Sequence, residues 1–173
     1  HLNMIKVKKH GVILKPTNLT FEDNGVLNPG CIQIGNTVHM FYRAYNKKHR
    51  SSIGYCKLNG PLKVIERFKK PILKTDFKYE RNLEDPKLVS IGRNFYLTYI
   101  AYDGKNVRPS YAISTNLKNW TKKGAIFPDI KYDKAGHQLH KNRLRLKERY
   151  FLFESYFKEL NGKNVLLWTK DCF

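Results

Sequence analysis

Two adjacent carboxylates, Glu84 and Asp85, stand directly before Pro86 at the start of an apolar segment. A carboxylate at the mouth of a strand can point into a pocket and act there as an acid or a base. Proline disfavours the α region for the residue before it, so the sequence predicts an extended backbone at Asp85. An Asp-Pro pair is also a common turn signal, and this motif alone is equally consistent with a plain turn.

A second copy of the motif lies earlier in the chain, where residues 28–44 align with residues 85–101 without a gap. The two prolines, the turn glycines and the last tyrosines coincide, and Asn28 takes the place of Asp85. A fixed period of about 40 to 60 residues filled by short strands is typical of a β-propeller. Equivalent positions on the inner strands of a propeller converge around its central channel. The repeat therefore predicts that Asn28 and Asp85 meet at this channel.

These residue types suit the cleavage of a glycosidic bond, which needs a protonated carboxyl group at the leaving oxygen. Asp85 is the predicted acid, whereas Glu84 should alternate away from it and form no catalytic pair with it. The amide of Asn28 can bind hydroxyl groups but cannot act as a base. Arg43 ends a strand beside the same channel, where it is expected to hold a hydroxyl group or an anion. A surface ion pair is the alternative for Arg43.

Short strands separated by Gly, Pro, Asn and Asp turns must position these residues. The sequence predicts one all-β domain over residues 1–173, with repeats at 28–84, 85–136 and 137–170 and no helix. The expected strands of the first two repeats are 31–34, 38–44, 51–58, 63–68, 87–91, 94–102 and 109–114, then a short strand ending at Pro128. A fainter third repeat is expected to hold strands at 143–146, 149–156 and 164–169. A further strand at 5–14 is expected to close against another blade.

Three repeats cannot close a ring, because the first and last sheets lack neighbours. The sequence therefore predicts either part of a longer propeller or an array whose open faces something else covers. Exposed apolar sheet faces drive association, so a homo-oligomer is an open expectation. The residues before Met4 resemble a vector remnant, which makes Met4 the expected native start.

Composition narrows the class of protein. The chain has 173 residues, 41% of them hydrophobic, which excludes a disordered chain. The formal net charge of +19 would suit nucleic acid, an acidic membrane surface or an anionic substrate. The lysines are scattered singly and in pairs, which favours a solvated surface. Specific nucleic-acid binding and membrane binding are therefore not expected, although a nucleic-acid binder stays open as an alternative supported by charge alone.

Three cysteines form an odd count without the spacing of a disulfide framework. Free thiols in a reducing compartment follow, and a cytoplasmic location is expected. No signal-peptide pattern or bilayer-spanning run occurs in the sequence. His137 and His140 lack a third ligand at a spacing that suits zinc, so neither a metal nor a cofactor is expected. No glycine-rich phosphate loop and no nucleophile motif with Ser or Cys beside His is present.

Five segments together carry a resemblance to a known family. They are residues 28–30, 40–44, 51–55, 84–87 and 99–105, and they resemble glycoside hydrolase family 130, the β-mannoside phosphorylases and related β-mannosidases. The resemblance runs from about Met4 to Phe173. It implies a five-bladed β-propeller, of which this chain would be an N-terminal fragment covering roughly three blades. The complete form would be an enzyme, either a phosphorylase or a glycosidase.

The same resemblance implies roles for the three candidate residues. Asp85 would be the general acid of an inverting mechanism and would act through a sugar hydroxyl. Asn28 and Arg43 would bind the mannosyl residue of a β-mannoside oligosaccharide. Inorganic phosphate, as co-substrate, would attack the anomeric carbon and release mannose 1-phosphate.

Some positions depart from the family pattern. Lys87 stands where the family usually has Arg, and the family's phosphate-binding residues lie mostly in later blades. Residues 170–173 resemble the opening of the next conserved block. Hydrolysis therefore stays open beside phosphorolysis, as does an inactive or binding remnant of such an enzyme. A five-bladed hydrolase of the arabinanase or invertase kind is disfavoured, because those enzymes carry a carboxylate where this chain has Asn28.

Overall fold

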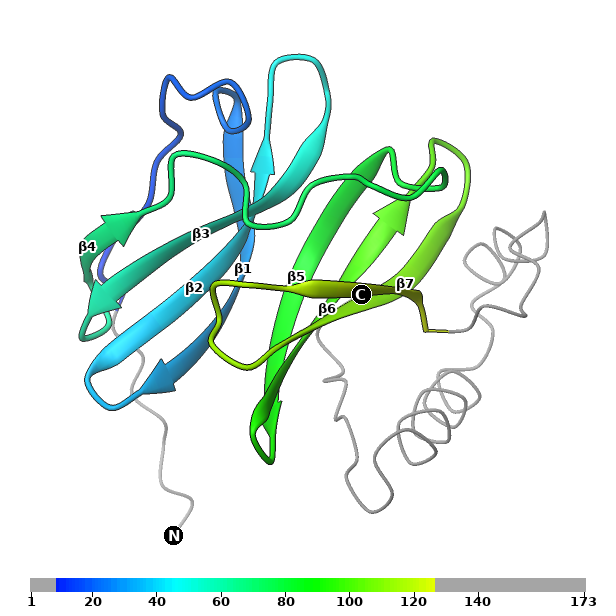
Figure 1. Cartoon of the computed structure of the whole chain (residues 1–173). Coiled ribbons are helices and arrows are strands. Elements are labelled where there is room, and N and C mark those ends of the chain that lie inside the picture. Colours follow the sequence, from blue (N-terminus) through cyan, green and yellow to red (C-terminus); the bar gives the residue numbers. More distant parts are fainter. Residues whose placement is uncertain (1–8, 127–173) are drawn as a thin grey trace, which may run out of the picture.

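The computed structural model describes residues 9–126, and in this part the chain is all-β (Figure 1). Two four-stranded antiparallel sheets follow each other, each with its strands in chain order. The first sheet contains β1 (Gly25–Ile34), β2 (Thr37–Tyr45), β3 (Ser51–Asn59) and β4 (Lys63–Arg67). The second contains β5 (Asn82–Ile91), β6 (Asn94–Tyr102), β7 (Val107–Ser114) and β8 (Thr121–Ala125). The third repeat, its three expected strands and both histidines at 137 and 140 lie outside the described residues.

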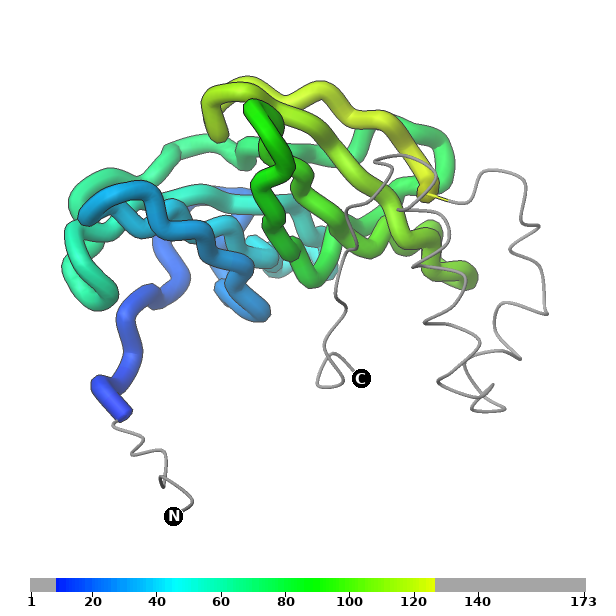
Figure 2. Tube along the Cα trace, turned by 90° about the horizontal axis from the view of Figure 1, so that it is seen from below, coloured from blue at the N-terminus to red at the C-terminus, as the bar shows by residue number. Residues whose placement is uncertain are grey.

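The two sheets lie side by side, with β1 and β5 at their junction (Figures 1 and 2). Apolar side chains from the facing surfaces form one core between them, in which the largest are buried completely. This core includes Phe41, Ile53, Tyr55, Leu83, Leu97, Tyr99, Ala112 and Leu117. Burial of this apolar surface is the main force that holds one sheet against the other.

The first strand of each sheet starts earlier than expected. A register shift between Leu27 and Gly30 allows β1 to pair with β2 on both sides of the Asn28-Pro29 step. An equivalent shift between Glu84 and Lys87 does the same for β5 and β6. Such β-bulges bend a strand and re-aim a side chain, and they tolerate proline because the bulged residue is unpaired.

The bulges overturn the expectation of an extended Asp85. Its φ angle is +49°, and that of Asn28 is +46°, so both lie in the left-handed region. Asn and Asp are among the residues that enter this region most readily, since their short polar side chains bond locally. The bulge geometry therefore outweighs the preference that the following proline imposes.

The expected strand at 5–14 is also wrong for its described part, since residues 9–14 form no strand. Gly11 has a φ angle of +83°, which breaks an extended run. Leu14 instead packs with Phe21 against the outer face of the first sheet, beside Met40 and Tyr42.

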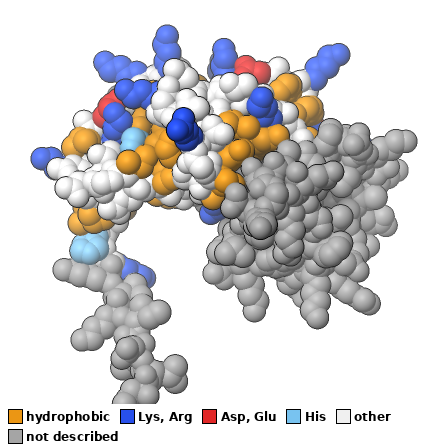
Figure 3. Space-filling model, turned by 60° about the horizontal axis from the view of Figure 1, so that its bottom comes forward, with side chains coloured by type: hydrophobic (Ala, Val, Ile, Leu, Met, Phe, Trp, Pro, Cys, Tyr) orange, Lys and Arg blue, Asp and Glu red, His pale blue; other side chains and the backbone are white. Residues whose placement is uncertain are grey.

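The described part shows how the charged side chains are distributed and how two of the cysteines are placed. Lys and Arg side chains are scattered over the visible face rather than gathered in one patch (Figure 3). Cys31 and Cys56 carry free thiols, and Cys172 lies outside the described residues. Within residues 9–126, no helix is long and apolar enough to cross a membrane.

Gly30 sets the distance between the two sheets. A Cβ atom there would lie 2.3 Å from the carbonyl oxygen of Pro86, a backbone atom that cannot swing aside. A Cβ atom at Gly25, on the same strand, would meet only Tyr45 at 3.8 Å. The contact between β1 and β5 therefore depends on the absence of a side chain at Gly30.

Gly30→Ala should lower the free energy of unfolding by about 1 to 3 kcal/mol, because overpacking forces the two backbones apart. Urea unfolding followed by circular dichroism measures this change. Gly25→Ala is the matched control and should stay close to the parent. Equal stability of the two variants would contradict the proposed contact.

Candidate functional site

The two bulges bring Asn28 and Asp85 together. The side-chain amide of Asn28 donates a hydrogen bond of 2.5 Å to Oδ1 of Asp85, across 57 residues of sequence. Asn28 is exposed and Asp85 is partly buried, so the pair lies at the surface end of the sheet junction. The prediction that these equivalent positions converge is thus confirmed, although their backbones are not extended.

Arg43 and Glu84 form an ion pair beside them. Nη2 of Arg43 on β2 lies 2.6 Å from Oε1 of Glu84 on β5, and the two side chains are 19% and 20% exposed. Arg43 therefore does form an ion pair, the alternative considered for it, but this pair is partly buried and links the two sheets. Glu84 thus bonds Arg43, whereas Asp85 bonds Asn28.

Sequence analysis missed Glu84 as the partner of Arg43, yet the repeat contained a signal. Leu27 pairs with Arg43 in β1 and β2, and at the same positions of the second sheet Glu84 pairs with Ile100. Each sheet thus carries one charged and one apolar residue at these positions, and the charges are opposite. The first sheet has its charged residue on β2 and the second has the opposite charge on β5, and an ion pair across the junction needs one charge of each sign.

The surroundings change the acidity of Glu84. Burial raises the pKa of the Glu84 carboxyl above its ordinary value, the neighbouring Arg43 lowers it, and the Asp85 charge raises it. The net direction is upward. A carboxylate in this position depends on its cation, because an unpaired buried charge is costly.

Arg43 retains capacity for a ligand. Its Nε atom is buried and has no hydrogen-bond partner among the described residues. Its guanidinium lies 5.5 Å from the centre of the Tyr45 ring, which limits its motion. A carboxyl group, an amide and a guanidinium donor thus stand together at one end of the junction. This set can bind a hydroxylated ligand and deliver a proton to it.

A second feature that the sequence analysis missed is a buried acid network in each sheet. Glu22 and Glu80, whose side chains are fully buried, are the acceptors. The Tyr42 hydroxyl donates to Glu22 at 2.8 Å, and the Tyr99 hydroxyl donates to Glu80 at 3.1 Å. The cations are Arg67, 3.0 Å from Glu22, and Lys122, which bonds Glu80. Tyr42 and Tyr99 are equivalent in the repeat, so both networks anchor the strand that follows the bulged one.

The described residues contain no group of three His, Cys, Asp or Glu side chains that could hold a metal ion. The candidate site consists of Asn28, Arg43 and Asp85, with Glu84 as the partner of Arg43.

Comparison with known proteins extends beyond the described part. A model of glycoside hydrolase family 130, described as beta-1,4-mannooligosaccharide phosphorylase, matches residues 6–172. The chain is 32% identical over 117 residues to a beta-1,2-mannobiose phosphorylase of Thermoanaerobacter sp. (strain X514), covering 58% of this chain and 38% of that protein. It is 27% identical over 144 residues to a 1,2-beta-oligomannan phosphorylase of the same organism. This match covers 75% of this chain and 48% of that protein. The chain therefore spans less than half the length of these relatives.

Solved structures share the fold. A glycoside hydrolase structure from Parabacteroides distasonis matches with a TM-score of 0.63 at 23% identity, covering 70% of this chain and 42% of that one. A beta-1,2-mannobiose phosphorylase from Listeria innocua matches with a TM-score of 0.56 at 17% identity, covering 67% of this chain and 48% of that one. The predicted fold class is confirmed: residues 9–126 are all-β, and the chain covers part of a five-bladed β-propeller fold.

Removal of the cation should raise the pKa of Glu84 further. In Arg43→Gln the carboxyl group keeps its burial and loses the charge that opposes it. Because a raised folded-state pKa favours the protonated form, the variant should lose stability as pH rises through that pKa. Carboxyl ¹³C NMR titration measures the pKa, and urea unfolding at several pH values measures the stability.

Arg93→Gln removes an exposed charge in the turn between β5 and β6 and serves as the control. It should leave the pKa of Glu84 where the parent has it. A parent-like titration of Glu84 in Arg43→Gln would show that the ion pair does not exist in solution.

Proposed function

The chain belongs to glycoside hydrolase family 130, and from this we propose that it supplies the first blades of an enzyme that cleaves β-mannosides by inverting phosphorolysis. The products would be mannose 1-phosphate and the shortened mannoside. The names of the two curated relatives, both phosphorylases of β-1,2-linked mannosides, support this substrate class. The convergence of Asp85, Asn28 and Arg43 at the sheet junction is the observation that carries the proposal.

Asp85 is the proposed general acid. Among the described residues, its hydrogen bond to Asn28 engages Oδ1 and leaves Oδ2 to deliver a proton. That proton reaches the leaving glycosidic oxygen through a sugar hydroxyl, while a phosphate oxygen attacks the anomeric carbon from the opposite face. The bond from the anomeric carbon to the leaving oxygen breaks and the configuration inverts. No cofactor enters this scheme.

Asn28 and Arg43 are the proposed binding groups for the mannosyl residue. The amide of Asn28 and the unpartnered Nε of Arg43 offer donors to sugar hydroxyls at the same end of the junction. Glu84 is a positioning residue, since it fixes the guanidinium that makes the contact. The proposed location is the cytoplasm, where phosphate is available and the free thiols stay reduced.

The reaction itself is tested with the chain, β-1,2-mannobiose and inorganic phosphate. Phosphorus NMR should show mannose 1-phosphate accumulating with time and in proportion to the phosphate supplied. Release of free mannose alone, at a rate independent of phosphate, would identify hydrolysis instead. The absence of both products would show that this chain is not an enzyme on this substrate.

Asp85→Asn should lower turnover of an unactivated mannoside by about a hundredfold to ten-thousandfold, the usual contribution of general acid catalysis. The amide keeps the shape of the side chain and lacks the proton. The loss should shrink for aryl mannosides with acidic leaving groups, because these leave without protonation.

Asp76→Asn is the control, since Asp76 is exposed and lies outside the candidate site. It should retain the turnover of the parent on both substrates. If Asp85→Asn reduced turnover equally on both substrate types, Asp85 would be a binding or structural group.

A further inference from the structure

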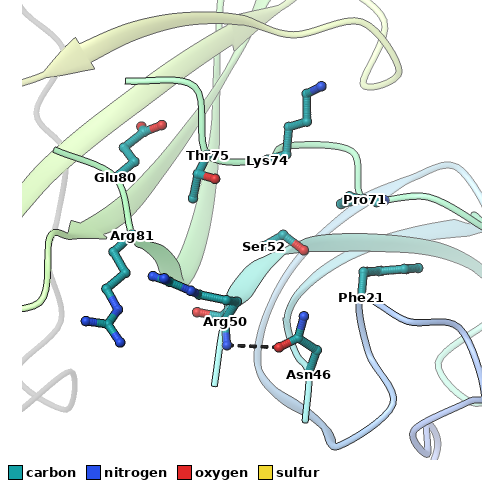
Figure 4. Close-up of a pocket in the computed structure, with 10 residues that line it drawn as sticks. Phe21, Asn46, Arg50, Ser52, Pro71, Lys74, Thr75, Glu80 and Arg81 are labelled. Carbon is teal, nitrogen blue, oxygen red and sulfur yellow. Dashed lines mark hydrogen bonds between the residues drawn. The ribbon is translucent and has the colours of Figure 1, made fainter. Parts of the chain in front are cut away.

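A hollow of about 440 Å³ opens where the turn between β2 and β3 faces the segment that joins β4 to β5 (Figure 4). Its walls include Phe21, Arg50, Ser52, Lys74, Thr75 and Arg81. Asn28, Arg43 and Asp85 do not line it. The hollow is therefore separate from the candidate site and lies within the size range of small-molecule pockets.

Both walls of the hollow are held by internal bonds. The backbone N–H of Ser51 donates to Oδ1 of Asn82 at 3.1 Å, a buried contact that ties β3 to β5. On the other side, Nζ of Lys122 donates to the carbonyl oxygen of Lys74 at 2.8 Å. A ligand would thus meet a preformed shape, which lowers the entropy lost on binding.

Three cations line the hollow and pair with no carboxylate of the described residues, and the side chain of Lys74 points away from the centre of the hollow (Figure 4). Arg50, Lys74 and Arg81 are exposed and form no ion pair with any described residue. Arg50 reaches across the hollow toward the wall that carries Glu80 and Arg81 (Figure 4). Like charges placed together repel each other, and a bound anion would relieve this cost.

The one carboxylate in the wall does not offset these charges. Glu80 is buried and bonds Lys122 and Tyr99, and it also accepts hydrogen bonds from the backbone N–H groups of Asp76 and Phe77. Its charge is therefore already compensated by Lys122.

Neutral groups complete the lining. The hydroxyls of Ser52 and Thr75 face the hollow, and Phe21 and Pro71 give it an apolar side. Oδ1 of Asn46 accepts from two backbone N–H groups of its own turn, so its amide N–H₂ remains to donate to a ligand. Hydroxyl and amide groups beside an apolar surface suit a sugar ring, which has polar edges and less polar faces.

We propose that this hollow binds a hexose monophosphate. The guanidinium groups of Arg50 and Arg81 match the geometry of a phosphate monoester, and Lys74 adds charge at the rim. Ser52, Thr75 and Asn46 receive the sugar hydroxyls. The proposal does not rest on the reaction proposed above, because the hollow shares no residue with the candidate site.

Isothermal titration calorimetry with mannose 6-phosphate, at an ionic strength of about 0.15 M to screen the general positive field, tests the proposal. Saturable binding is expected, and neutral mannose should bind at least about tenfold more weakly. The double variant Arg50→Gln and Arg81→Gln should weaken mannose 6-phosphate binding by at least about tenfold. Both side chains are exposed, so its melting temperature should stay that of the parent.

Arg93→Gln with Lys123→Gln is the matched control, because it removes the same charge from exposed positions outside the hollow. It should keep the parent affinity. If this control lost as much affinity for mannose 6-phosphate, the loss would come from the lower net charge of the chain, and the proposal would be overturned. Inorganic phosphate that binds as tightly as mannose 6-phosphate would exclude a sugar subsite, and the absence of saturable binding would exclude the site altogether.

Discussion

The close approach of β1 and β5 is the constraint on which the described structure depends. Gly30 lies against the carbonyl of Pro86, a contact that leaves no space for a side chain. Each strand carries the same bulge at this point, which turns Asn28 and Asp85 into the left-handed region and toward each other. If the strands moved apart, the two side chains would lose their hydrogen bond and the site would open.

Charged groups support this junction from both sides. The ion pair of Arg43 and Glu84 crosses it, and the buried carboxylates Glu22 and Glu80 fix the tyrosines of β2 and β6 behind it. Buried carboxylates are tolerated only when hydrogen-bonded and paired, and here each has both a hydroxyl donor and a cation. Because Arg43 directly follows the anchored tyrosine of β2, its position is set by that network as well as by its own ion pair.

The repeat between residues 28–44 and 85–101 was sufficient to predict β2, β6 and the meeting of Asn28 with Asp85. It could not predict the left-handed backbone at Asp85, because the local rule for a residue before proline ignores the register shift imposed by the neighbouring strand. The pairing of Arg43 with Glu84 joins different positions of the two repeats, so it can be inferred only when both aligned pairs, Leu27 with Glu84 and Arg43 with Ile100, are considered together. Residues 9–14 alternate weakly between apolar and polar side chains, as a strand would, but they pair with none of the described strands.

If the two bulges form one binding site for a mannoside, ¹⁵N NMR of the chain titrated with β-1,2-mannobiose should detect it. The side-chain amide of Asn28 and the backbone amides of Gly30 and Lys87 should shift most and should follow one saturation curve. Amides of distant turns, such as Gly60, should stay in place. Saturable shifts confined to other parts of the chain, with the bulge amides unmoved, would show that the mannoside does not bind at the bulges.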